Sequence, residues 1–87
     1  MVLTEQVLHS LNIFVQNPCE EMLYYLEHDL VILHDVIHEA QHQDSAIKTP
    51  DAELIAVFDV LNNCHFGLDD EIVGILDANV RNLIQAL

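Results

Sequence analysis

Eighty-seven residues are enough for one small domain, whose single hydrophobic core is marginally stable unless a partner chain, a metal or a disulfide supports it. Fifteen acidic residues stand against only two basic ones, Lys48 and Arg81, which gives a formal net charge of −13 at pH 7. That imbalance argues against direct binding to nucleic acid or to an anionic membrane, because both require Lys and Arg to neutralise phosphates.

The spacing of apolar residues is helical along the whole chain, and no alternating strand pattern of useful length occurs. The first predicted helix covers residues 4–16, with Thr4 as its N-cap and Glu5 in its first turn, where a negative charge is favourable. The residues on its apolar face are Val7, Leu8, Leu11, Phe14 and Val15.

The second predicted helix is the longest and covers residues 18–43, about 39 Å at 1.5 Å per residue. Asn17 is its predicted N-cap, Pro18 suits the first helical position, and Glu20 completes a capping box. Its apolar residues occupy about half of the circumference, which is more than one neighbouring helix covers. They form a main stripe and one flank, namely Cys19, Met22, Leu23, Leu26, Leu30, Leu33, Ile37 and Ala40, with Tyr25, Ile32 and Val36 beside them.

A polar loop, residues 44–49, precedes the third predicted helix, residues 50–63, with Thr49 as N-cap and Pro50 at the first helical position. Only Asp59 interrupts the apolar run that follows Glu53, so we expect this helix to be buried nearly all round, in the centre or at an interface. Its apolar residues are Leu54, Phe58 and Leu61 on one face and Ile55, Ala56, Val57 and Val60 around the rest.

Gly67 marks the last turn, and Asp69 is the predicted N-cap of the fourth helix, residues 70–87. Asp77 and Arg81 have the i,i+4 spacing of an ion pair on the outer side of that helix. The residues expected to face inward are Ile72, Val73, Leu76, Val80, Leu83, Ile84 and Leu87.

Four helices with short loops predict an all-α fold: one domain, residues 1–87, with a small four-helix bundle-like architecture and one long helix. The first and third helices are much shorter than the second, so a symmetrical monomer would leave part of the second helix unpaired. We therefore expect a helical homodimer built along the second and third helices. The interface candidates are Tyr25, Ile32, Val36, Val57 and Val60.

Cys19 and Cys64 could form at most one disulfide, and the chain starts without the basic segment and apolar run of a signal peptide. The longest uninterrupted apolar run, residues 30–33, is far too short to span a membrane. We therefore expect a cytoplasmic protein with two free thiols. The cysteines also lack the spacing of zinc ligands, and we expect no cofactor.

Six histidines are present, and His34, His38 and His42 share the face of the second helix opposite the core. Adjacent pairs of these could reach one metal ion, but a third ligand would have to come from elsewhere, which makes them weak metal candidates. A pH response is another hypothesis, because protonating all six would move the net charge from −13 to −7. The remaining interpretation is an ordinary exposed polar face.

The sequence does not indicate an enzyme. Cys64 and His65 are adjacent, and adjacent residues rarely point at one another as nucleophile and base. The chain also lacks a phosphate-binding glycine loop and a nucleophile elbow. We therefore expect no catalytic residues.

The acidity has three explanations: solubility, adaptation of the source organism to salt, or a surface matched to a basic partner. The leading functional hypothesis builds on the third, a non-enzymatic inhibitor, antitoxin-like protein or regulatory adaptor that binds a basic site on another protein. The alternatives are a self-assembling structural homodimer and a His-rich metal-binding or pH-responsive helical protein. The residues expected to contact the basic partner are Glu20, Tyr24, Glu27, Asp35, Asp70 and Asp77.

Overall fold

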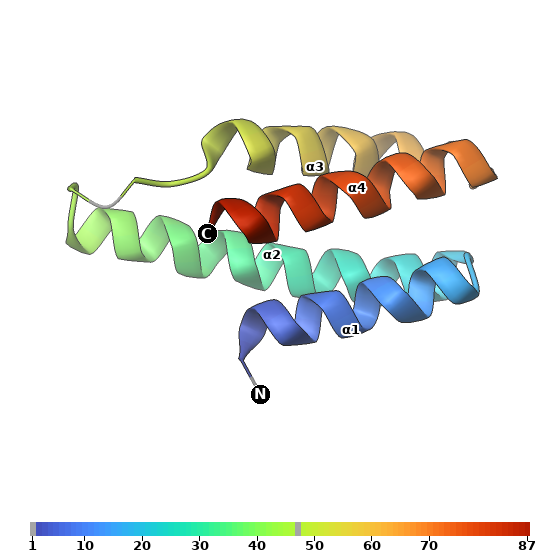
Figure 1. Cartoon of the computed structure of the whole chain (residues 1–87), viewed down its shortest axis with the longest axis horizontal. Coiled ribbons are helices and arrows are strands. Elements are labelled where there is room, and N and C mark those ends of the chain that lie inside the picture. The colour runs from blue at the N-terminus through green and yellow to red at the C-terminus, as the bar shows by residue number, and fades with distance from the viewer. Residues whose placement is uncertain (1, 47) are drawn as a thin grey trace.

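The computed structural model describes residues 2–46 and 48–87, which contain four helices and no strand. Met1 and Ile47, the latter within the predicted polar loop, lie outside the described residues. Successive helices run in opposite directions (Figure 1), and the predicted all-helical class is confirmed. The helices are α1 (Leu3–Gln16), α2 (Glu20–Gln43), α3 (Asp51–Cys64) and α4 (Asp70–Ala86).

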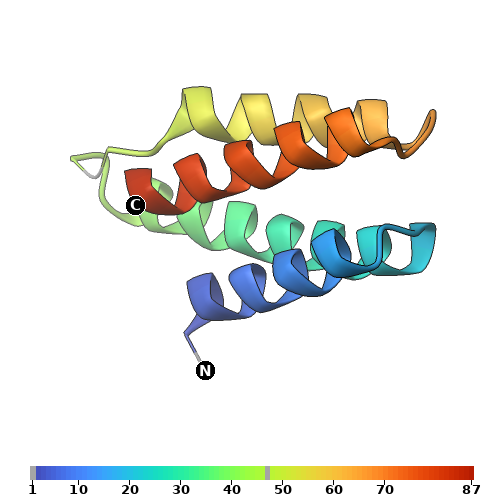
Figure 2. The same ribbon diagram turned by 45° about the vertical axis from the view of Figure 1, so that its right-hand side comes forward.

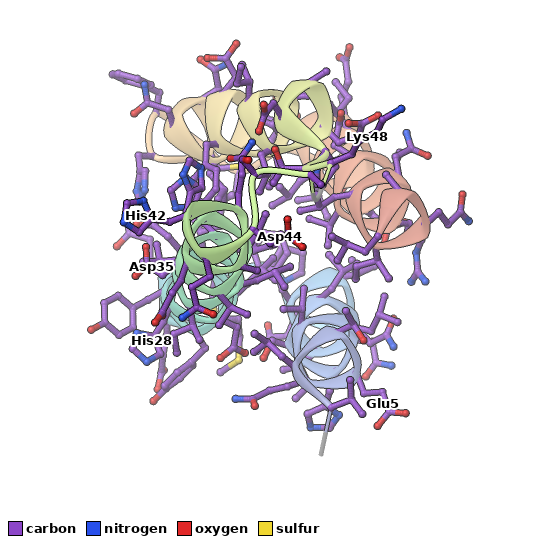
Figure 3. The ribbon with its side chains drawn as sticks, turned by 90° about the vertical axis from the view of Figure 1, so that its left-hand side faces the viewer. Glu5, His28, Asp35, His42, Asp44 and Lys48 are labelled. Atoms are coloured by element: carbon purple, nitrogen blue, oxygen red, sulfur yellow. The ribbon has the colours of Figure 1, made fainter. Side chains whose placement is uncertain are left out.

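The four helices form a bundle-like body of two stacked hairpins. The α3–α4 hairpin lies above the α1–α2 hairpin in both Figure 1 and Figure 2. Seen from one end, the helices stand at the four corners of the bundle (Figure 3). The backbones pack most closely within each hairpin, and α1 also packs against α4. Within the described residues, α2 and α3 show no comparable close packing, so this fourth side of the bundle is the open one.

Each helix contributes one narrow stripe to a single core. The buried apolar positions in every helix follow one another at intervals of three and four residues, the spacing that lets side chains of one helix fit between those of its neighbours. No helix in the described part of the chain is long and apolar enough to cross a membrane. The core residues are Val7, Leu11 and Phe14; Leu23, Leu26, Leu30 and Leu33; Leu54, Val57, Leu61 and Cys64; and Val73, Leu76, Val80 and Leu83.

The predicted starts of α1 and α2 are wrong. Thr4 is not an N-cap, because α1 begins at Leu3 and Val2 stands at the cap without a side-chain hydrogen bond. Leu3 packs against the core, and this packing favours a helix that begins one residue before Thr4. Asn17 ends α1 instead of starting α2, since its N–H donates to carbonyl groups of the last turn of α1. Cys19 then occupies the cap position before α2.

The prediction for α3 needs two corrections. Thr49 does not cap the helix, because its hydroxyl donates to the Asp51 carboxylate at 2.6 Å and Pro50 occupies the cap position. The helix is also not buried nearly all round, since Ile55 is 67% exposed. That exposure follows from the open side of the bundle, where no helix packs closely on α3.

The start of α4 and its ion pair are as predicted. The Asp69 carboxylate accepts a hydrogen bond from the Ile72 N–H at 2.8 Å, which satisfies one of the free donors at the helix start. Arg81 Nε donates to Asp77 Oδ1 at 3.0 Å, and its Nη2 donates to Asn12 Oδ1 of α1 at 3.0 Å. One guanidinium therefore links α4 to α1.

Replacing the observed cap should cost more stability than replacing the wrongly predicted one. We expect Asp69→Ala to lower the free energy of unfolding by about 1 kcal/mol, because it leaves the Ile72 N–H without its acceptor. The matched variant Thr4→Ala should change it by less than about 0.5 kcal/mol. Urea unfolding followed by circular dichroism measures both, and equal losses would contradict the observed caps.

Candidate functional site

A continuous groove runs along the open side of the bundle, and we call it the α2/α3 groove. It consists of three adjoining hollows of about 420, 410 and 500 Å³. Glu27 and His65 line both the first and the second hollow, while Ile55 and Phe58 line both the second and the third. Because neighbouring hollows share these side chains, the three form one surface feature between the two helices.

The middle of the α2/α3 groove is apolar. Ile55 is largely exposed there and Phe58 is half-buried beside it. The His34 ring meets the Phe58 ring edge-on, with their centroids 5.5 Å apart. His38 lies against His34 in turn, with a centroid distance of 4.2 Å. The groove therefore offers a hydrophobic and aromatic floor.

Carboxylates line both walls of the groove. Glu20, Glu21 and Glu27 come from α2, and Asp51 and Asp59 come from α3. Among the described residues that line the three hollows, none is a lysine or an arginine. Most of these carboxylates gather towards the start of α2, so the negative charge is greatest at that end of the groove.

The two basic residues lie elsewhere. In Figure 3, His28, Asp35 and His42 lie on the outer face of α2, and Lys48 points to the opposite side of the molecule. Arg81 is held on α4 by its bonds to Asp77 and Asn12. The groove is thus left with uncompensated negative charge, except where histidine contributes.

One histidine connects the two sides of the groove. His65, directly after α3, contacts Glu27 of α2, with Nε2 and Oε2 2.8 Å apart. Both side chains remain partly exposed, at 54% and 36%. The pair bridges the two walls at the acidic end, and sequence spacing alone did not predict it because 38 residues separate the partners.

Cys64 and His65 point in different directions. Cys64 is buried in the core, whereas His65 reaches outward to Glu27. Burial raises the pKa of the Cys64 thiol above its ordinary value of 9.0, and the nearby Asp69 charge raises it further. A thiol kept protonated and turned inward is a poor nucleophile.

The structure brings together three of the six residues predicted to bind a basic partner. Glu20, Tyr24 and Glu27 line the first hollow of the groove. Asp35 lies on the outer face of α2 with its side chain 74% exposed (Figure 3). The other two predicted residues are on α4, where Asp70 is exposed in the first turn and Asp77 is engaged by Arg81.

Some of the residues predicted to form a dimer interface are exposed, and others are buried or half-buried. Tyr25, Ile32 and Val36 are exposed on α2, at 51%, 38% and 52%. Val57 is 0% exposed inside the core, so its side chain is not available to a second copy, and Val60 is half-buried against the core. The apolar strip on α2 is therefore the part of the predicted interface that reaches the surface.

The three weak metal candidates do not gather around one point. His34 and His38 are neighbours, His34 Nδ1 lies 3.4 Å from Asp35 Oδ1, and His42 is on the outer face of α2. Across the ranges 2–46 and 48–87, no group of three or more His, Cys, Asp or Glu side chains is close enough to hold a metal ion.

Sequence reasoning missed one buried carboxylate. Asp29 of α2 is only 5% exposed and accepts hydrogen bonds from Gln6 Nε2 at 3.1 Å and from Ser10 Oγ at 2.5 Å, both on α1. The sequence does contain one sign of its burial, which is its position beside Leu26 and Leu30 on the face of α2 that points into the core. The interaction joins α1 and α2 in one register, as polar groups buried between helices do when each has its partner.

Removing this carboxylate should destabilise the fold. We expect Asp29→Ala to lower the free energy of unfolding by about 1–3 kcal/mol, because Gln6 and Ser10 lose their acceptor in a half-buried site. Asp35→Ala removes the same charge from an exposed position of the same helix and should cost less than about 0.5 kcal/mol. Urea unfolding compares the two, and similar losses would show that the α1–α2 contact contributes little.

The two thiols should differ in reactivity. At pH 8 we expect iodoacetamide to modify the half-buried Cys19 faster than Cys64, because burial and a raised pKa leave Cys64 with little accessible thiolate. The protonated Cys64 favours the fold below its ordinary pKa of 9.0, and that contribution is lost as pH rises through the higher pKa of the folded state. Mass spectrometry of the modified peptides measures the rates, and urea, as a control, should make them similar.

A comparison of the chain with protein-family models, curated proteins and solved structures finds no match.

Proposed function

We propose that this protein is a non-enzymatic interaction protein, an inhibitor, antitoxin-like protein or regulatory adaptor, whose acidic helical surface binds a basic site on another protein. The observation that carries this proposal is the charge balance. Fifteen carboxylates stand against two cations, and one of those cations, Arg81, is already engaged by Asp77 and Asn12. The surface is therefore complementary to a partner rich in Lys and Arg.

The placement of the acidic residues supports the proposal. Glu20 and Glu27 converge with the exposed ring of Tyr24 at one end of α2. Tyrosine combines a large contact area with a hydroxyl group that can form hydrogen bonds, and it is enriched among residues that dominate binding energy. A tyrosine between carboxylates is therefore suited to contact a basic protein surface.

We also propose that the protein acts in the cytoplasm. The support is that Cys19 and Cys64 are both free, one half-buried and one in the core. Free cysteines are typical of compartments that keep thiols reduced.

Self-assembly is a second candidate function, favoured by the exposed strip of Tyr25, Ile32 and Val36 on α2. Burying that strip against a second copy would remove apolar surface from water. Each copy carries a net charge of −13, so the two would repel one another. Added salt would therefore strengthen self-association, whereas it would weaken binding to a basic partner. The sign of the salt effect distinguishes the two functions.

The first test is a pull-down from a native lysate of the source cells at low salt, eluted stepwise with rising salt and identified by mass spectrometry. We expect a basic protein to be released at moderate salt. With the purified pair, the association rate should fall by roughly tenfold or more as salt rises, because screening removes electrostatic steering. Recovery of this protein alone, with a sedimentation mass twice that of one chain, would instead support self-assembly.

A further inference from the structure

We propose that the α2/α3 groove receives a basic amphipathic helix of the partner, with its apolar side on Ile55 and Phe58 and its Lys and Arg residues along the carboxylate walls. This inference rests on the proposed function, because it names the segment of the basic partner that binds and the surface that receives it.

The shape of the groove fits a helix. It lies between two antiparallel helices on the one side of the bundle where neighbouring helices are not closely packed. α3 has 14 residues, so a partner helix lying along it would need about 21 Å, or roughly four turns. A helix laid into a hydrophobic groove between helices is a common mode of peptide recognition.

The floor of the groove is complementary to an occupant with an apolar face. Ile55 is 67% exposed although it lies on a helix whose other face is in the core. Phe58, one turn further along the same side, is half-buried and already contacts the His34 ring. An occupant with Leu or Ile residues three and four positions apart would cover both side chains at once.

The carboxylates on the walls are complementary to positive charge on the same occupant. Glu20, Glu21 and Glu27 face the groove from α2, and Asp59 faces it from α3 near the same end. At the opposite end, Asp51 is the one carboxylate among the described residues that line the third hollow, and α2 contributes His34, His38 and Gln41 there. The Lys and Arg residues of the occupant should therefore concentrate at the end that binds beside Glu27.

A second copy of this chain fits the groove poorly. Each of its helices begins with acidic residues in the first turn, and Lys48 and Arg81 are its only Lys and Arg residues. Placing any of these helices between carboxylate walls would bring like charges together. Charge complementarity therefore favours a basic partner as the occupant.

The test uses a fluorescein-labelled synthetic peptide of about 18 residues, with Leu on one helical face and Lys and Arg on the other. Binding to the full chain is measured by fluorescence anisotropy at low salt, and the contact surface is mapped by nuclear magnetic resonance shifts of backbone amides. A scrambled peptide of the same composition serves as the first control, because it keeps the charge and loses the apolar face. We expect it to bind at least about tenfold more weakly.

The protein variants form a matched pair. Ile55→Ser with Asp59→Asn changes one apolar and one acidic residue in the groove, both exposed. Ile75→Ser with Glu5→Gln makes the same two kinds of chemical change at exposed positions that do not line the groove. We expect the first pair to weaken peptide binding by about tenfold and the second by less than about twofold. Circular dichroism confirms that both variants remain folded.

The outcomes separate this inference from the function on which it rests. Amide shifts concentrated on α2 and α3, with loss of binding in the groove variant alone, would support the inference. Equal weakening in both variants, shifts spread over all four helices, or equal binding of the scrambled peptide would overturn the groove while leaving a basic partner in place. If no cationic peptide binds, the inference fails, and if the lysate also yields no basic protein, the proposed function fails with it.

Discussion

The spacing of the core residues is the constraint on which the rest of the structure depends. In α4, for example, Val73, Leu76, Val80 and Leu83 are buried at intervals of three, four and three residues, and the other helices repeat this pattern. A stripe that uses about two positions in seven turns one narrow face of each helix inward. The remaining positions are free to carry carboxylates, so the core does not conflict with a net charge of −13.

Periodicity predicted the four helices and most of their inward faces, because both depend on local spacing. Periodicity did not predict the helix boundary correctly where one residue could belong to either of two local structures. Asn17 can start a helix or end one, and in the fold its N–H closes the last turn of α1. It failed also at Asp29, whose hydrogen-bond partners on α1 lie 19 and 23 residues away. A buried carboxylate looks like a surface residue until those partners are known.

The candidate site was only partly accessible to prediction. The acidic residues and Tyr24 at the start of α2 could be identified from composition and helical phase. The groove could not, because it depends on how far α3 stands from α2, and periodicity does not encode that distance. Ile55 illustrates the gap: its apolar surroundings in the sequence predicted burial, yet it is exposed on the groove floor. The Glu27–His65 contact likewise appears only once the hairpins are stacked.

The charge distribution couples folding to the ions around the protein. Folding brings fifteen carboxylates into a body with principal-axis extents of 39 × 25 × 18 Å, so the folded chain attracts a denser cloud of cations than the unfolded one. Those counterions act as weakly held ligands of the native state and stabilise it. A basic partner would displace them into solution, replacing many mobile cations with a few fixed ones. The free protein is therefore least stable in dilute electrolyte, where the attraction to such a partner is strongest.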